Sequence, residues 1–430
     1  MRSVGAAALT AGLLVVPLAS AAVFGRPAEI PLAKTPVSVA VTDATQDGVV
    51  DLVLVNASAP ILTVLPGRRD GSFERPLGVG TGPVPRSIAV GDFDNDGSDD
   101  LAVAGGNEIA IFTGRDETLV RLGRISVPAP SVMATADLDS DGNLDLLAGR
   151  VDESVVSVFP GLGDGTFLAP RVHPVGSPAT SLFVGDLNGD ETPDVASSGN
   201  GVSVLFGNGD GTLRGYQFVG GPSGARGLAG DDFDADGFVD LAAAHGANLV
   251  TILRNTGDEQ FTGAGSHTVG GTPVALAAAD VDSDGSTDLV TANRGANDVS
   301  VLLGDDDGHF QQQSRIRVGR TPTGLAIEDL DADGTLDLVT ANRGSKTVTA
   351  MLNGADAPQP VVCLVPGVAH RTLAVARRLV GSRNCRVGAV RRKYSNRVRR
   401  GRVISVSPLP GTRAPVDTHV TLLVSKGRRR

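Results

Sequence analysis

One aspartate-rich motif occurs seven times along the chain at a nearly constant interval. Its first residue lies at positions 43, 92, 137, 186, 232, 280 and 329, so consecutive copies are 45 to 49 residues apart. Self-similarity at a fixed period of this length is the signature of repeat architectures, in which each unit packs only against its neighbours. The period therefore restricts most of the chain to a solenoid or a propeller.

Each repeat has the pattern of four short strands. A segment such as "TPVALAAADVDSDG" leads into the aspartates, and "DLVTANRG" or a relative follows with enough apolar residues for a strand buried on both faces. An alternating run such as "VSVLLG", a turn such as "GDGTF" and a weaker strand complete the unit. Turn residues separate these runs, and helical periodicity is missing from them. The 56 Gly, 25 Pro and 3% aromatic residues agree with many short strands and tight turns.

Seven such units predict an all-β fold, a seven-bladed β-propeller with four-stranded blades over residues 23–354. A linear β-solenoid is the alternative, but its repeats are usually shorter and it needs capped ends. The last unit stops at "VTAMLNGADAPQP" without a fourth strand. The N-terminal "FGRPAEIPLAKTP" has the missing pattern, since Pro36 lies 12 positions after Phe24, as Pro85 does after Phe73. We therefore expect the N-terminal strand to complete the seventh blade and remove an open edge.

The motif itself, Asp-x-Asp-x-Asp-Gly-x-x-Asp, predicts a metal site. Ca²⁺ takes about six to eight oxygen ligands, and carboxylates at positions 1, 3, 5 and 9 with a carbonyl near position 7 can surround one ion. Gly at position 6 permits the sharp reversal of the loop. An EF-hand is excluded because Glu is absent from position 12 and the flanking segments have the pattern of strands. The alternative is a set of Asx-turns at solvated corners; five complete copies favour metal binding.

These loops resemble the FG-GAP or VCBS repeats of integrin-type propellers over about residues 24–354. The resemblance implies five to seven structural Ca²⁺ ions in the loops between strands. The five complete loops would supply Asp92, Asp94, Asp96, Asp100; Asp137, Asp139, Asp141, Asp145; Asp232, Asp234, Asp236, Asp240; Asp280, Asp282, Asp284, Asp288; and Asp329, Asp331, Asp333, Asp337. The first loop has Thr45 at position 3 and keeps Asp43, Asp47 and Asp51. The fourth has Asn188 at position 3 and Glu191 in place of Gly, and keeps Asp186, Asp190 and Asp194.

The first residues have the pattern of a secretory signal peptide at 1–22. Arg2 precedes an apolar run that ends at the small residues Ala19-Ser20-Ala21. An N-terminal membrane anchor is the alternative, but Pro17 interrupts a run that is short for a membrane span. We therefore expect an exported, secreted monomer without a transmembrane segment after signal removal.

Charge divides the chain into two parts. The net charge is −10, but residues 359–430 hold 17 of the 38 Lys and Arg and a single acid, Asp417, so this segment carries +16 and the remainder −26. Such asymmetry indicates separate domains, here a basic domain at 361–430 after a linker at 355–360. "TLAVARRLVGS" has helical spacing, with Leu373, Ala376, Leu379 and Val380 on one face, and "VISVSP" and "HVTLLVS" alternate as strands.

The basic domain is similar to a PASTA domain, a module of bacterial cell-wall enzymes and kinase ectodomains. The matching features are Val365-Pro366-Gly367, the helix from Leu373 to Leu379, "CRVG" at 385–388, "SPLPG" at 407–411 and the final "VSKG". The resemblance implies a small α+β domain that associates with peptidoglycan. The arginines could also attract anionic wall polymers or serve only solubility; nucleic acid is not expected for an exported chain with few aromatics.

The two cysteines, Cys363 and Cys385, both lie in the basic domain. In an oxidising compartment such a pair forms a disulfide that stabilises by about 3 kcal/mol. Reduced core thiols are the alternative. No His or Cys cluster accompanies them that would indicate a metal or catalytic site.

Catalytic machinery is not evident in the sequence. The six histidines are scattered, and "PGLGDGTF" lacks the Lys and the helix of a phosphate loop. The predicted function is therefore a non-catalytic binding or adhesion protein at the cell surface or cell wall, with an unknown protein or glycan ligand on the propeller. A polysaccharide-acting lyase or hydrolase and a structural spacer are the alternatives. The propeller has no Trp and one Tyr, Tyr216, which weakens the case for a sugar-binding platform.

Overall fold

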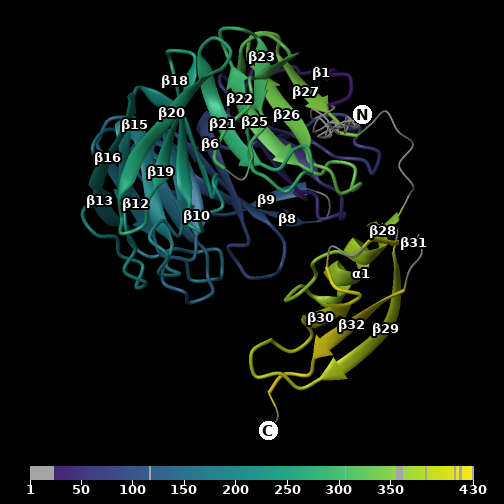
Figure 1. Cartoon of the computed structure of the whole chain (residues 1–430). Coiled ribbons are helices and arrows are strands. Elements are labelled where there is room, and N and C mark those ends of the chain that lie inside the picture. The colour runs from purple at the N-terminus through teal and green to yellow at the C-terminus, as the bar shows by residue number, and fades with distance from the viewer. Residues whose placement is uncertain are drawn as a thin grey trace, which may run out of the picture.

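The structure, a computed structural model, describes residues 24–115, 118–305, 307–354, 362–382, 385–410, 413–415 and 419–428. The predicted signal peptide and the predicted linker lie outside these residues. Residues 24–354 form a ring of antiparallel sheets, and a small α+β unit follows it (Figure 1). Among the described residues no helix is long and apolar enough to cross a membrane.

Seven sheets form the blades, and neighbouring strands within each sheet are antiparallel. In blades one to six the strands follow one another in chain order from the inner strand outward. The strands of blades one to six are β2 (Pro36–Thr42), β3 (Asp51–Asn56), β4 (Ile61–Leu65), β5 (Leu77–Gly80); β6 (Pro85–Gly91), β7 (Asp100–Gly105), β8 (Glu108–Arg115), β9 (Thr118–Ser126); β10 (Pro130–Ala136), β11 (Asp145–Arg150), β12 (Val155–Phe159), β13 (Arg171–Pro174); β14 (Ser181–Gly185), β15 (Asp194–Leu205), β16 (Gln217–Ser223); β17 (Ala225–Asp231), β18 (Asp240–His245), β19 (Leu249–Asn255), β20 (Phe261–Thr268); and β21 (Pro273–Ala279), β22 (Asp288–Asn293), β23 (Asp298–Leu302), β24 (Ser314–Arg317). The fourth blade differs from the prediction, because the single element β15 covers both central strand positions.

The seventh blade is closed by the N-terminal strand, as predicted. β1 (Ala28–Pro31) pairs with β27 (Thr347–Met351), which continues through β26 (Asp337–Asn342) to the inner strand β25 (Pro322–Glu328). The inner strands contact one another in turn around the ring, and β25 contacts β2, so the ring is complete. Closure leaves β27 with a partner on each side, which removes an open strand edge.

The hydrophobic core of the ring lies between the blades. Each of seven clusters of buried apolar residues draws its members from two neighbouring blades, and the cluster between blades seven and one joins Leu52 and Leu54 to Val339 and Val348. The second strand of each blade is buried along most of its length, which explains its nearly continuous apolar sequence. Each blade is thus held by both neighbours, and stability depends on a closed ring.

The C-terminal unit has one helix on a small sheet, as the sequence predicts. Its elements are β28 (Val362–Leu364), α1 (Leu373–Ser382), β29 (Arg386–Lys393), β30 (Val403–Ser407), β31 (Arg413–Pro415) and β32 (His419–Ser425). Ala376 and Val380 of α1 are fully buried against Val403, Val420 and Leu422 of the sheet. Cys385 is buried in the same core, but the side chain of Cys363 lies outside the described residues, so the disulfide stays a prediction.

Candidate metal centres

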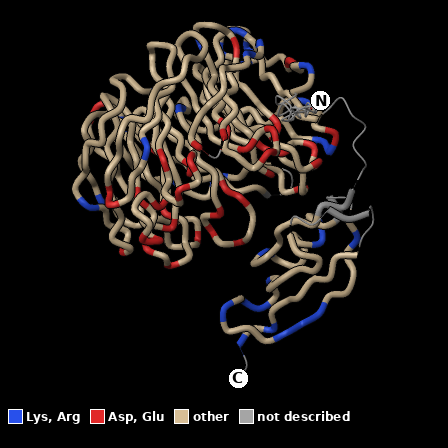
Figure 2. Tube along the Cα trace, in the orientation of Figure 1, with Lys and Arg blue, Asp and Glu red and all other residues tan. Residues whose placement is uncertain are grey.

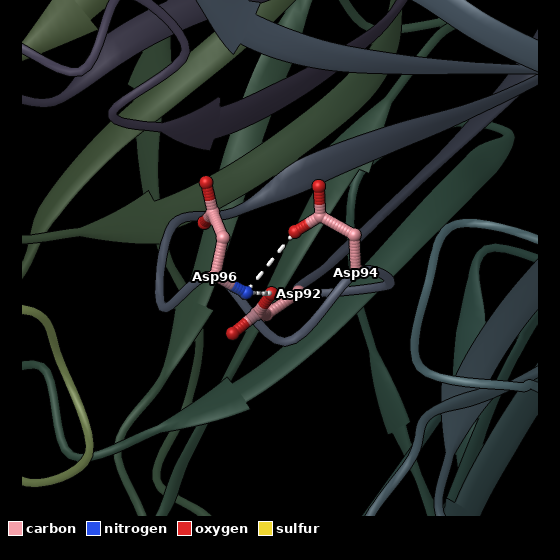
Figure 3. A group of neighbouring side chains, drawn as sticks. All are labelled: Asp92, Asp94 and Asp96. Carbon is pink, nitrogen blue, oxygen red and sulfur yellow. Dashed lines mark hydrogen bonds between the residues drawn. The ribbon is translucent and has the colours of Figure 1, made fainter. Parts of the chain in front are cut away.

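The aspartate loops connect the first and second strands of the blades, and therefore all lie on the same face of the ring. In the second loop, the backbone N–H of Asp96 donates to Asp92 Oδ1 at 3.0 Å and to Asp94 Oδ1 at 3.1 Å, and Gly97 N–H donates to Asp92 Oδ2 at 2.8 Å. These bonds hold the carboxylates of Asp92 and Asp94 against the backbone of Asp96, and one carboxylate oxygen of each of the three residues lies within 4.8 Å of the others (Figure 3). Asp284 and Asp333 repeat the double donation in their own loops.

Five loops bring carboxylate oxygens close enough to share an ion. One oxygen from each of three aspartates lies within 4.8 Å of the others in the groups Asp92, Asp94, Asp96; Asp137, Asp139, Asp141; Asp232, Asp234, Asp236; Asp280, Asp282, Asp288; and Asp329, Asp331, Asp333. These are the five loops whose sequence is complete. Position 9 joins such a group in only one of them, through Asp288.

Two loop positions have a left-handed backbone. Gly at position 6 does so as predicted, with φ of 90° at Gly97 and 93° at Gly237. Position 4 also has positive φ, although it is not glycine in the complete loops: the angle is 55° at Asn95 and 62° at Ala332. Non-glycine residues pay a steric cost in this region. The sequence gives no signal for this second reversal, because Asn, Ser and Ala all occupy the position.

The aspartate at position 9 has a role that the sequence analysis missed. Asp145 is 1% exposed; its Oδ2 accepts from Leu138 N–H at 3.1 Å and its Oδ1 from Gly161 N–H at 2.9 Å. The same two-sided pattern recurs at Asp51, Asp194, Asp288 and Asp337, where one oxygen binds the loop and the other binds the turn after the third strand. Each carboxylate oxygen has a second lone pair. Position 9 can therefore tie the blade together and still face a cation.

Burial and crowding make these carboxylates costly to ionise alone. Burial, with the nearby Asp94 and Asp92, raises the pKa of Asp100 to about 7. Burial, followed by Asp234 and Asp236, likewise raises the pKa of Asp240 to about 7, and burial with neighbouring aspartates raises that of Asp331 to about 6. A divalent cation in the loop would favour the charged forms.

The donor set fits a hard cation. All side-chain donors are carboxylate oxygens, the ligands that Ca²⁺ and Mg²⁺ prefer. Asp100 Oδ1 and Asp234 Oδ1 are buried and accept no hydrogen bond from the described residues. Unpaired buried acceptors are rare in folded proteins, so these two atoms suit ligands. The five loops thus have the residues and the arrangement to bind metal ions.

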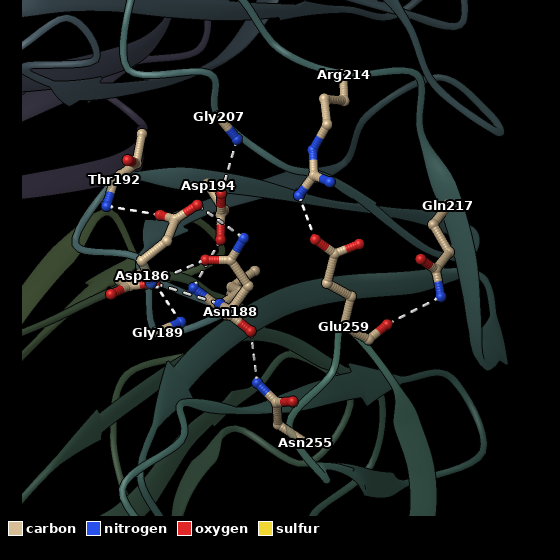
Figure 4. Close-up of polar contacts among 12 residues, drawn as sticks. Asp186, Asn188, Gly189, Thr192, Asp194, Gly207, Arg214, Gln217, Asn255 and Glu259 are labelled. Carbon is tan, nitrogen blue, oxygen red and sulfur yellow. Dashed lines mark hydrogen bonds and ion pairs between the residues drawn. The ribbon is translucent and has the colours of Figure 1, made fainter.

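The first and fourth loops differ in the described residues, because neither gathers three carboxylates. In the fourth loop Asn188 Nδ2 donates to Asp190 Oδ2 at 3.0 Å, and Asn188 Oδ1 accepts from Asp190 N–H at 3.1 Å. Figure 4 shows Asn188 in this loop beside Asp186 and Gly189. The amide thus stabilises the neighbouring carboxylate from within the protein. In the first loop, Thr45 leaves Asp43 and Asp47 without a third carboxylate at position 3, although burial raises the pKa of Asp43 to about 6.

Replacing Glu191 by Gly is expected to stabilise the fourth blade by about 0.5–1 kcal/mol, because Glu191 is exposed and held at a φ of 64° that disfavours side chains. The midpoint of urea unfolding measures the effect. Gly237→Glu is the matched control: Gly237 has φ of 93° in open space, so this change should destabilise by about 1–2 kcal/mol. An unchanged or lower midpoint for Glu191→Gly would contradict the assignment of strain.

The C-terminal unit lies against the second and third aspartate loops. A β-carbon added to Gly97 would lie 3.0 Å from Cδ of Arg371 and 3.4 Å from Nη1 of Arg402. A cavity of about 400 Å³ separates Asp92 and Asp141 from the arginines of the C-terminal unit. Figure 2 shows acidic residues along the side of the propeller nearest to this unit. The basic and acidic parts of the chain therefore face each other.

Comparison with known families and structures agrees with this architecture. The model of the FG-GAP-like repeat matches residues 43–103, 92–148, 137–197, 232–291 and 280–340, and the PASTA domain model matches residues 364–426. No curated protein matched the chain.

Among solved structures, the chain is similar to BBS1N, solved in complex with ARL6DN, at 16% identity and a TM-score of 0.57, covering 79% of this chain and 99% of that one. It is also similar to Kuenenia stuttgartiensis hydrazine synthase, at 16% identity and a TM-score of 0.54, covering 76% and 97%. Identities this low show the fold alone.

Proposed function

Because the chain belongs to the FG-GAP-like repeat family and ends in a PASTA domain, we propose that it is an exported, calcium-stabilised, non-catalytic binding protein of the bacterial cell surface or cell wall. The C-terminal domain associates with peptidoglycan, and the propeller presents a ligand-binding face. Calcium neutralises the five carboxylate clusters and so holds the loops between the first and second strands.

One observation carries the wall-binding part of this proposal. The C-terminal domain keeps cations exposed although part of it lies against the propeller: Arg391, Arg392 and Lys393 at the end of β29 are all exposed. The pairing of β29 with β32 places these residues along one strand of the domain's sheet. A basic strand of this kind is available to the anionic groups of a bacterial wall.

The non-catalytic part rests on how the carboxylates are used. The acids that a glycoside-cleaving enzyme would need as an isolated pair are here gathered in loops, where backbone N–H groups hold them. Such positions suit ion binding better than proton transfer to a substrate.

Wall association is tested by retention of the full-length protein on purified bacterial peptidoglycan, in Ca²⁺ and across a salt series. We expect binding that survives about 0.5 M salt, where the screening length falls below about 5 Å and simple attraction between exposed charges is lost. The variant Arg391→Glu/Arg392→Glu/Lys393→Glu should elute at low salt. If the wild type also elutes at low salt, the domain is only a basic surface and the wall-binding proposal fails.

A further inference from the structure

The face of the propeller opposite the aspartate loops carries a set of unpaired cations. The inner strand of each blade begins on this face. The turns between the second and third strands of the blades also lie on it. We call the set the basic face; its members are Lys34, Arg86, Arg226, Arg294, Arg320, Arg343 and Lys346. All seven are exposed, and none forms an ion pair with a described acid.

Hydrogen bonds join the members on blades six, seven and one, and the order of the blades around the ring adds Arg226 on blade five and Arg86 on blade two, so the seven residues form one arc. Arg343 N–H donates to Thr321 O at 2.9 Å, and Gly344 N–H donates to Arg320 O at 2.8 Å. Leu32 N–H donates to Lys346 O at 2.8 Å, which places Lys346 beside the segment that leads to Lys34. Between blades six and seven, Thr321 N–H donates to Asn297 Oδ1 at 2.7 Å.

Acidic residues are missing from the turns of this arc. The segments 33–35, 57–60, 81–84, 106–107, 246–248, 270–272, 294–297, 319–321 and 343–346 contain no Asp or Glu. Two acids that begin third strands on this face are neutralised: Glu108 pairs with Arg121 at 2.6 Å and with Arg124, and the buried Asp298 pairs with Arg315. In the third blade, which lies outside the arc, Arg150 pairs with Asp152 and Glu153. A strongly acidic propeller thus has one positively charged face, opposite the loops that face the C-terminal domain.

A cavity opens on the same face next to the arc. It has a volume of about 520 Å³ and is lined by Arg226 and by the polar side chains of Ser131, Ser177, Thr180 and Asn200. This volume is in the range of small-ligand sites, about 300–1,000 Å³. The exposed ring of Phe218 lies beside Gly201, which follows the cavity residue Asn200. Hydroxyl and amide groups, a guanidinium and a ring at the edge are the groups that bind sugars.

We propose that the basic face and its cavity bind an anionic polysaccharide, with sulfate, phosphate or uronate groups on the arginines and one or two sugar units in the cavity. This deepens the proposed binding function by naming a face and a ligand class. An acidic protein fits less well, because a protein interface needs a buried apolar or aromatic centre. Apart from the exposed Val84, the turns of the arc consist of Arg, Lys, Thr, Ser, Asn, Gly, Pro and Ala. The cations are spaced across several blades, so a polysaccharide with an anionic group on each repeating unit can contact several of them at once.

Binding of a fluorescent heparin hexasaccharide to the full-length protein at about 50 mM salt tests the proposal. Arg226→Glu/Arg294→Glu/Arg343→Glu is expected to weaken hexasaccharide binding by at least about tenfold. The charge-conserving variant Arg226→Lys/Arg294→Lys/Arg343→Lys should retain hexasaccharide binding. The tail variant Arg391→Glu/Arg392→Glu/Lys393→Glu makes the same change in charge and should leave binding within about threefold of wild type. Equal losses in the two Glu variants, or a loss in the tail variant alone, would overturn the proposal.

A second variant and two further probes separate sugar recognition from general charge. Asn200→Trp, which fills the cavity mouth at an exposed position, should weaken hexasaccharide binding and leave poly-glutamate binding unchanged. Poly-glutamate and a short DNA duplex should bind more weakly than the hexasaccharide; equal or tighter binding would reject a glycan in favour of an acidic protein or nucleic acid. The variant Arg226→Glu/Arg294→Glu/Arg343→Glu should be retained on peptidoglycan as strongly as wild type. A failure of wall binding through the C-terminal domain would therefore leave the hexasaccharide result unchanged.

Discussion

Chelating calcium with EGTA is expected to lower the free energy of unfolding of the propeller by about 7 kcal/mol relative to protein in about 5 mM Ca²⁺. Each complete loop, with a Kd near ~0.5 mM, contributes about 1.4 kcal/mol at that concentration, and five loops gather three carboxylates. Urea unfolding in the two buffers measures the difference. Equal midpoints would mean that the loops hold their shape without an ion.

A single isosteric change distinguishes a metal site from an Asx-turn. Asp282→Asn gives the sixth loop the amide that the fourth loop has at Asn188, where it accepts the same backbone N–H bond. We expect a loss of about 1.4 kcal/mol in about 5 mM Ca²⁺ and no loss in EGTA. Asp164→Asn is the matched control, because Asp164 accepts from Thr166 in an exposed turn outside the loops; its effect should not depend on calcium. A loss for Asp282→Asn that is equal in both buffers would favour the Asx-turn.

The effect of calcium on the free energy of unfolding, measured by urea unfolding in calcium and in EGTA, should depend on pH. The sign of this dependence follows from the raised pKa values. Without a bound cation, burial raises the pKa of Asp100, Asp240 and Asp337 to about 7 in the folded state, above that of an unfolded aspartate. Their contribution to stability is therefore present below about pH 4 and is lost as the pH rises through about 7. Calcium binds the ionised forms, so its stabilising effect should grow over this interval. A calcium effect that shrinks with rising pH would contradict the assignment.

Deleting residues 24–31 is expected to destabilise the propeller by about 6–8 kcal/mol. The deletion removes four cross-strand residue pairs between β1 and β27 and the contacts of Phe24 and Ile30 with the core; each hydrogen bond contributes about 1 kcal/mol and each half-buried side chain about 1–2 kcal/mol. It also exposes the edge of β27, which can then pair with another molecule. Urea unfolding measures the first effect and size-exclusion chromatography the second.

Point variants in β1 keep this test informative if the deletion prevents folding. Ile30→Ala should cost about 1–3 kcal/mol through lost packing, whereas Glu29→Ala, at an exposed position of the same strand, should change stability by less than about 0.5 kcal/mol. Equal effects of the two variants would show that β1 does not contribute to the seventh blade through its inward face.

Much of the propeller could be predicted because its determinants are local. The seven copies, the buried second strands and the Gly at position 6 follow from periodicity and turn chemistry within about ten residues. The closing strand could also be predicted, since residues 24–36 repeat the spacing of other units. The helix face with Ala376 and Val380 was equally evident from its period.

Other features depended on contacts between distant residues. Asp145 ties Leu138 to Gly161, and that second bond depends on the turn after the third strand. The basic face is formed by residues between Lys34 and Lys346 that come from five of the seven blades. The contact of Arg371 with Gly97 joins two domains.

The repeat, the strand pattern and the residue types in each loop can be read from the amino-acid sequence, because they depend on residues that are neighbours along the chain. Which charges share a face depends on the folded ring, because ring closure aligns the same end of every blade. It thereby sets acidic loops on one side and unpaired arginines on the other.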